Sequence, residues 1–112
     1  MSTRKISRGS VYWVHLDPTI GTEIKKTRPA AVISNDVQNE FSNRVVVAPI
    51  SSNVDNVYSF EVKIDVKNIP SKIMPDQLRS IDKIRIGKYI CDLPRSTIKD
   101  LDKAIKLILS LD

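Results

Sequence analysis

The feature that most constrains this fold is a change in apolar spacing close to Pro94. Before that point, apolar residues come in short runs rich in β-branched and aromatic side chains, separated by turn residues. The runs cover residues 10–16, 30–34, 44–50, 58–66 and 87–92. After it, apolar residues recur at helical spacing. Short strands followed by one helix predict a mainly β (α+β) fold, a small antiparallel barrel with a C-terminal α-helix and short helical turns.

Two of the runs indicate how such a barrel is packed. Residues 10–16 place apolar groups on both faces of the expected strand, as in a small barrel with another element packed outside it. Residues 58–66 alternate apolar and charged side chains, which predicts a half-exposed antiparallel strand. We expect a polar loop over 35–43, irregular or short strands over 67–77, and one helical turn within 78–85.

The C-terminal segment has the pattern of an amphipathic helix of three to four turns. Thr97 and Asp100 resemble a capping box, and Pro94 stands just before them. The expected apolar stripe consists of Ile98, Leu101, Ala104, Ile105, Leu107, Ile108, Leu109 and Leu111. We expect this helix to cover the barrel, with a contact between subunits as the alternative.

The chain length of 112 residues predicts a single domain, 1–112, with residues 1–7 flexible. The single cysteine, Cys91, cannot form an internal disulfide, which favours a reducing compartment. No apolar run approaches the roughly 20 residues that span a membrane, and no signal peptide is evident. We therefore expect a cytoplasmic protein without a disulfide, cofactor or Cys/His zinc site.

The formal net charge of +5 favours a polyanionic partner such as nucleic acid or an acidic protein segment. The sequence has no phosphate-binding glycine-rich loop and no Gly-x-Ser-x-Gly nucleophile elbow. The single histidine, His15, lies in an apolar run, where a structural role is favoured and an acid–base role remains open.

Polar residues concentrate in three segments, 23–28, 51–53 and 76–85, each next to an expected strand or turn. Pro29 restricts the backbone of Arg28 to extended geometry at the end of a loop. A guanidinium can hold a phosphate through two hydrogen bonds and stabilise charge during phosphodiester attack. RNA brings its own nucleophile, the 2′-hydroxyl, so this small set of side chains suits RNA better than DNA.

A series of motifs in order closely resembles the MazF/PemK (Kid) toxins of bacterial type II toxin–antitoxin systems. The motifs are RGSVYW (8–13), LDP (16–18), GTE (21–23), KTRP (26–29), VISND (32–36), NEFS (39–42), VVVAPIS (45–51) and DQLRSIDK (76–83). The resemblance implies an SH3-like barrel, a homodimer, and metal-independent cleavage of single-stranded RNA at short sequences. It also implies 2′,3′-cyclic phosphate and 5′-hydroxyl ends, and a cognate antitoxin whose acidic, flexible tail covers the RNA groove.

The resemblance assigns catalytic roles to two residues. Arg28 matches the catalytic arginine of the family, and Ser51 falls where many members have a catalytic threonine. Asp76 matches an acidic residue of the Kid branch. Met74 and Thr22 stand where that branch has an arginine and a histidine, which favours a mechanism based on Arg28 and Ser51.

Further residues are candidates for contact with RNA. They are Glu23, Lys25, Lys26, Asn35, Ser52, Asp76, Gln77, Arg79 and Arg85. Glu23 can equally be solvated, Asn35 can equally cap a turn, and Arg79 can pair with an aspartate instead. Trp13 is expected in the core or a dimer interface rather than as a base-stacking surface. The alternative to an enzyme is a non-catalytic barrel that binds RNA or an acidic peptide.

Overall fold

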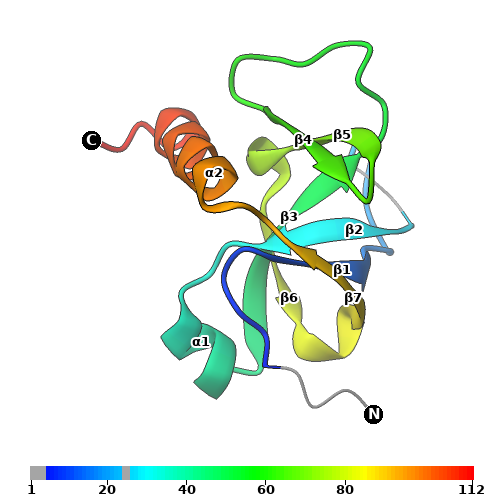
Figure 1. The fold of residues 1–112 in the computed structure, drawn as a ribbon. Coiled ribbons are helices and arrows are strands. Elements are labelled where there is room, and N and C mark those ends of the chain that lie inside the picture. Colours follow the sequence, from blue (N-terminus) through cyan, green and yellow to red (C-terminus); the bar gives the residue numbers. More distant parts are fainter. Residues whose placement is uncertain (1–4, 24–25) are drawn as a thin grey trace.

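The structure is a computed structural model that describes residues 5–23 and 26–112. It is mainly β, with the C-terminal helix lying against one side of a curled sheet (Figure 1). The strands are β1 (Ser10–His15), β2 (Thr27–Val32), β3 (Arg44–Ser51), β4 (Val62–Val66), β5 (Ile69–Ile73), β6 (Arg79–Asp82) and β7 (Ile86–Asp92). The helices are α1 (Asp36–Phe41), η1 (Pro75–Gln77), η2 (Lys83–Arg85) and α2 (Arg95–Ile108), where η marks a 3-10 turn.

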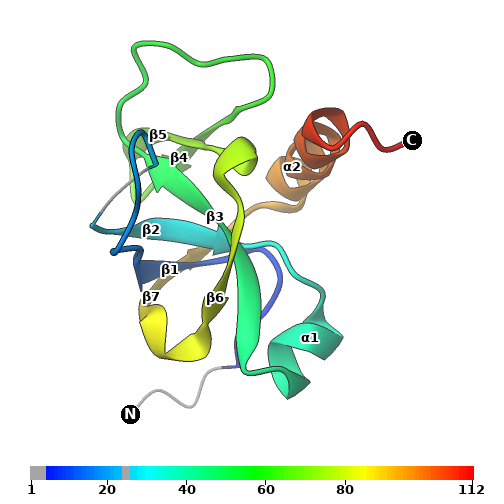
Figure 2. The same cartoon turned by 180° about the vertical axis from the view of Figure 1, so that it is seen from behind.

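Strand β3 organises the sheet, whose order is β4-β5-β3-β2-β1-β7. One edge of β3 pairs with β2, and the other pairs first with β6 and then with β5. Figure 2 shows β3 running from the β4–β5 hairpin down to α1. All these pairings are antiparallel, so the predicted mainly β antiparallel fold with a C-terminal helix is confirmed.

The sheet buries apolar side chains on both of its faces. One core, inside the curl, contains Tyr12, Val14, Leu16, Ala30, Val32, Val45, Val47 and Ile81. The other, between the sheet and α2, contains Val11, Ala31, Ala48, Ile50, Val62, Val66, Ile73, Leu93, Leu101 and Ala104. Neighbouring residues of β1 and β2 therefore belong to different cores, as expected for a strand with two apolar faces.

Residues 35–43 contain the short helix α1, so the expected polar loop is wrong. The Asn35 side chain begins the helix by accepting a hydrogen bond from the Gln38 N–H at 2.8 Å. Hydrogen bonds from the Arg8 N–H and the Asn39 side chain hold the pKa of the Asp36 carboxyl below its usual value. Local capping forms this helix, since Val37 and Phe41 are both exposed.

Helix α2 begins earlier than expected, with Pro94 at the N-cap and no side-chain cap. Thr97 therefore lies inside the first turn, and the predicted capping box is wrong. Leu101 and Ala104 are buried against the sheet, as expected of a covering helix. Leu107 is exposed within α2, and Leu109 and Leu111 follow its last residue, Ile108, and are exposed as well.

Two other elements differ from expectation. Residues 78–85 form β6 as well as the 3-10 turn η2. The strand expected over 58–66 begins only at Val62, because residues 58–61 form a turn in which the Glu61 N–H donates to the Tyr58 carbonyl at 2.9 Å. The expected short strand over 67–77 is present as β5.

Outside these elements, Lys5–Ser7 run beside the sheet, with the Tyr12 hydroxyl donating to the Lys5 carbonyl at 3.3 Å. Residues 1–4 lie outside the described part, and the flexibility of 1–7 stays a prediction. Burial raises the pKa of the Cys91 thiol, which packs beside the core under α2. Within residues 5–23 and 26–112, the helices are all too short or too polar to cross a lipid bilayer.

Candidate active site

Arg28 is the second residue of β2, where it pairs with Val14 of β1. Pro29 follows it and brings no N–H to the sheet, in line with the predicted extended backbone. The Arg28 side chain is half-buried and lines a groove of about 520 Å³. Trp13, Ser52, Lys67 and Tyr89 line the same groove. The groove therefore combines aromatic surface with two cationic side chains.

Ser51 is the last residue of β3 and lies at the same end of the sheet as Arg28. Pairs between β2 and β3 run from Val32 with Val47 to Ala30 with Pro49. The paired part of the two strands ends there, and extending its register by two residues places Arg28 opposite Ser51. The extended register thus places the two predicted catalytic residues at the same end of β2 and β3, although they are 23 positions apart in the sequence.

The Ser51 hydroxyl is already engaged locally. Its oxygen accepts a hydrogen bond from the Asn53 N–H at 3.1 Å, and the residue is buried. On the other edge of β3, Ser51 pairs with Lys72 of β5. Ser51 therefore lies where β2, β3 and β5 meet.

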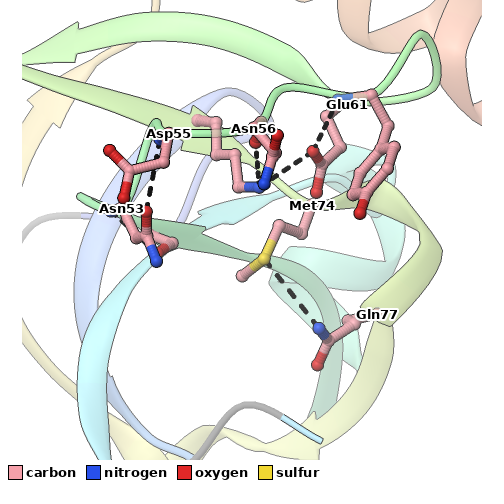
Figure 3. A network of polar contacts seen from close by, with 9 residues as sticks. Asn53, Asp55, Asn56, Glu61, Met74 and Gln77 are labelled. Carbon is pink, nitrogen blue, oxygen red and sulfur yellow. Dashed lines mark hydrogen bonds and ion pairs between the residues drawn. The ribbon is translucent and has the colours of Figure 1, made fainter. Parts of the chain in front are cut away.

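A second hollow, of about 510 Å³, gathers four of the predicted RNA-binding residues: Glu23, Asp76, Gln77 and Arg79. Glu23 does more than face solvent, because its carboxylate accepts a hydrogen bond from the Ile20 N–H and closes its own turn. The Gln77 amide nitrogen lies 3.9 Å from the Met74 sulfur (Figure 3). Asp76 is exposed.

Two arginines hold the loop between β1 and β2. Arg79 donates to the Leu16 carbonyl at 2.8 Å, and Arg85 donates to the carbonyls of His15 and Asp17. Asp82 instead accepts from the Ile84 N–H, so the alternative of an Arg79–aspartate ion pair is wrong within the described part of the chain. Both arginines have a positioning role in addition to any contact with RNA.

The remaining predicted residues are dispersed. Lys26 is exposed and has a positive φ of 71°. Asn35 caps α1, which follows the far end of β2 from Arg28. Lys25 lies outside the described residues. Ser52 is exposed at the rim of the groove. The RNA contacts of these residues stay predictions.

Two residues of β1, Trp13 and His15, lie outside the core. Trp13 is 44% exposed, so it is not part of the core of the single chain and only the dimer contact remains of that prediction. His15 is exposed, and its Nδ1 lies 2.7 Å from the Thr27 hydroxyl. Among the described residues, no group of three or more His, Cys, Asp or Glu side chains is placed to hold a metal ion.

Sequence reasoning missed the network that orders the loop over 52–61. In Figure 3, Asn56 and Glu61 are joined by dashed lines to one ammonium group, that of Lys72. Its Nζ donates to the Asn56 carbonyl at 2.7 Å and to Glu61 Oε1 at 2.9 Å. The available signal was a single lysine in the otherwise uncharged run 69–75, because a lysine in a buried strand requires a partner.

Comparison with known proteins gives a consistent result. The model of a family described as the PemK-like, MazF-like toxin of type II toxin–antitoxin systems matches residues 7–109. Endoribonuclease MazF9 of Mycobacterium tuberculosis is 34% identical over 113 residues, covering 93% of this chain and 96% of that protein. The non-catalytic alternative is therefore set aside.

Solved structures agree on the fold. A crystal structure of MazF from Deinococcus radiodurans superposes with a TM-score of 0.84 at 22% identity, covering 94% of this chain and 96% of that one. A mycobacterial endoribonuclease in complex with its cognate antitoxin superposes with a TM-score of 0.77 at 19% identity, covering 97% of each chain.

Proposed function

We propose that this chain, which belongs to the PemK-like, MazF-like toxin family and is an endoribonuclease, cleaves single-stranded RNA. It does so at short sequences and without a metal ion. The observation that carries the proposal is the place of Arg28 in the wall of a groove with cationic and aromatic side chains, and the register between β2 and β3, extended by two residues, places Ser51 opposite it. Single-stranded RNA suits such walls, because its bases stack on aromatic rings and its phosphates bind cations.

The proposed reaction uses the nucleophile that RNA itself contains. The 2′-oxygen attacks the adjacent phosphorus and loses its proton, while the bond from phosphorus to the 5′-oxygen breaks and that oxygen gains a proton. The products are a 2′,3′-cyclic phosphate and a 5′-hydroxyl. Arg28 holds the phosphate and stabilises the charge that develops on its oxygens, and the Ser51 hydroxyl donates to the same phosphate.

The proposal includes three partners and a location. The cognate antitoxin binds the groove with an acidic tail, supported by the +5 net charge and by the mycobacterial relative solved with its antitoxin. A second copy of the chain completes a homodimer that covers exposed apolar surface such as Trp13. The third partner is the RNA substrate. A cytoplasmic location follows from that substrate and from the single cysteine.

The test is incubation of the purified protein with long single-stranded RNA in EDTA. We expect cleavage at a short recurring sequence, with 5′ ends that accept phosphate from a kinase and 3′ ends that resist phosphatase until acid opens the ring. Arg28→Ala should abolish cleavage while the protein stays folded. Arg44→Ala is the matched control, because Arg44 is exposed at the opposite end of β3. Intact RNA with folded wild-type protein overturns the proposal.

A further inference from the structure

The ion pair between Lys72 and Glu61 is unusual because it is buried. The two side chains are 11% and 5% exposed, and the atoms that join them lie 2.9 Å apart. Lysine and glutamate are almost never buried unless they are paired, because both charges lose their hydration. Such a pair holds its two chain segments together, and here the segments are strand β5 and the end of the loop over 52–61.

The ammonium group of Lys72 satisfies several parts of that loop at once. Besides Glu61, it binds the Asn56 carbonyl at 2.7 Å and lies 5.7 Å from the centre of the Tyr58 ring. Glu61 in turn accepts a hydrogen bond from the Tyr58 N–H at 2.9 Å. The Tyr58 ring stacks on Phe60 with centroids 5.5 Å apart. One lysine therefore organises the second half of the loop.

The first half of the loop is joined to Ser51 by a chain of hydrogen bonds. The Asn53 N–H donates to the Ser51 hydroxyl, and the Asp55 N–H donates to the Asn53 side-chain oxygen at 3.2 Å (Figure 3). Ser51 and Lys72 are also direct partners across β3 and β5, so their side chains share one face. The loop is thus joined to Ser51 near its first residue and to Lys72 at its last, and these two residues are neighbours in the sheet.

We infer that Lys72 and Glu61 form a latch that fixes the 52–61 loop and thereby holds the Ser51 hydroxyl and Ser52 in position for RNA cleavage. The inference rests on the proposed function. Lys72 and Glu61 are positioning residues, since both are turned into the protein and act on the substrate through Ser51 and the loop. Catalysis depends on placement within fractions of an ångström, so a loosened loop lowers turnover more than binding.

The test compares Lys72→Met with Lys63→Met in the full chain. Lys63 is the exposed partner of Lys72 on β4, so its substitution removes the same charge from the same sheet and leaves both members of the ion pair in place. In Lys72→Met, we expect hydrogen exchange of the 52–61 amides to accelerate about tenfold or more. We expect kcat to fall about tenfold or more, with binding of a 2′-deoxy substrate analogue changed less than about threefold. Lys63→Met should leave all three values unchanged, and Lys72→Arg should restore part of kcat.

Each contrary result is decisive. Unchanged exchange in folded Lys72→Met overturns the latch, and accelerated exchange with unchanged kcat overturns its positioning role. If Lys72→Met fails to fold, the double variant Lys72→Met with Glu61→Leu carries the same test, because it leaves no buried charge unpaired. Absence of cleavage by the wild-type protein overturns the proposed function instead, and the exchange experiment then still decides the latch.

Discussion

Two loops leave the sheet at the end where Arg28 and Ser51 lie, and they are held in opposite ways. The loop over 52–61 is fixed from the inside, by the buried pair of Lys72 and Glu61. The loop over 16–26, of which 24 and 25 lie outside the described residues, is fixed from the outside. There Arg79 and Arg85 donate to its backbone carbonyls from half-buried positions.

The difference concerns what happens when one partner is lost. When one member of a buried ion pair is removed, water cannot take its place, and the charge that remains destabilises the protein strongly. A carbonyl near the surface accepts a hydrogen bond from water when an arginine is removed, so the loss is smaller. Loss of one partner should therefore cost much more stability at the loop over 52–61 than at the loop over 16–26.

The largest effect should come from Lys72→Ala, which leaves the Glu61 carboxylate buried and unpaired. We expect the free energy of unfolding to fall by about 3–5 kcal/mol. Urea denaturation followed by circular dichroism measures it. Lys63→Ala, an exposed substitution on the neighbouring strand, should change it by less than about 0.5 kcal/mol. Equal losses of unfolding free energy from the two substitutions would show that the buried ion pair stabilises the protein no more than an exposed lysine does.

Replacing both members of the pair should recover much of that loss. In Lys72→Met with Glu61→Leu, no charge is buried, and apolar side chains of similar size fill the site. We expect a coupling energy between the two positions of about 2 kcal/mol from a double-mutant cycle of urea denaturations. Strictly additive losses would mean that the two side chains act independently, which contradicts the latch.

Arg79→Ala should have a smaller effect than Lys72→Ala. It removes a charged donor from the Leu16 carbonyl, and we expect a loss of about 1.5 kcal/mol in unfolding free energy. Limited proteolysis should then cut within 16–26 sooner than within 52–61. Arg79→Lys is the control, since it keeps a cationic donor. A loss as large as that of Lys72→Ala would remove the distinction between the loops.

The smallest effect is expected at the exposed ion pair of Lys5 and Glu40, whose side chains are 81% and 51% exposed. Lys5→Ala should lower the unfolding free energy by less than about 0.5 kcal/mol, because water and salt screen the pair. The same urea titration measures it and sets the baseline for a surface pair in this protein. A loss above 1 kcal/mol would contradict this view of exposed charges.

The fold was predictable where apolar spacing decides the structure. Strands β1, β3 and β7 and helix α2 follow from their patterns within a few residues. Helix α1 has no buried apolar face, so periodicity gave no sign of it, although its Asn35 cap was visible in the sequence. The pattern over 58–66 predicts the start of β4 too early, because the turn over 58–61 is closed by a backbone hydrogen bond and Glu61 pairs with a lysine from another strand, which no local pattern contains.

The site was predictable only through the resemblance to a family. Composition singles out neither Arg28 nor Ser51, and their approach depends on the register between β2 and β3. The sequence predicts RNA contacts for Arg79 and Arg85, because a surface arginine and an arginine that holds a loop look alike in sequence. Their carbonyl partners lie more than 60 positions away, at 63 for Arg79 and Leu16 and 70 for Arg85 and His15.

Pro49 marks a position in the sheet that is weak under mechanical force. It lies where one edge of β3 stops pairing with β6 and starts pairing with β5. The last pair with β6 is Val47 with Arg79, and the first pair with β5 is Ile50 with Ile73. Its carbonyl accepts from the Met74 N–H, but the residue has no N–H of its own to offer to that edge. If β5 separates from β3 under force, the separation reaches a position at Pro49 where one inter-strand hydrogen bond is absent. The β4–β5 hairpin can therefore detach while β6 stays paired with β3.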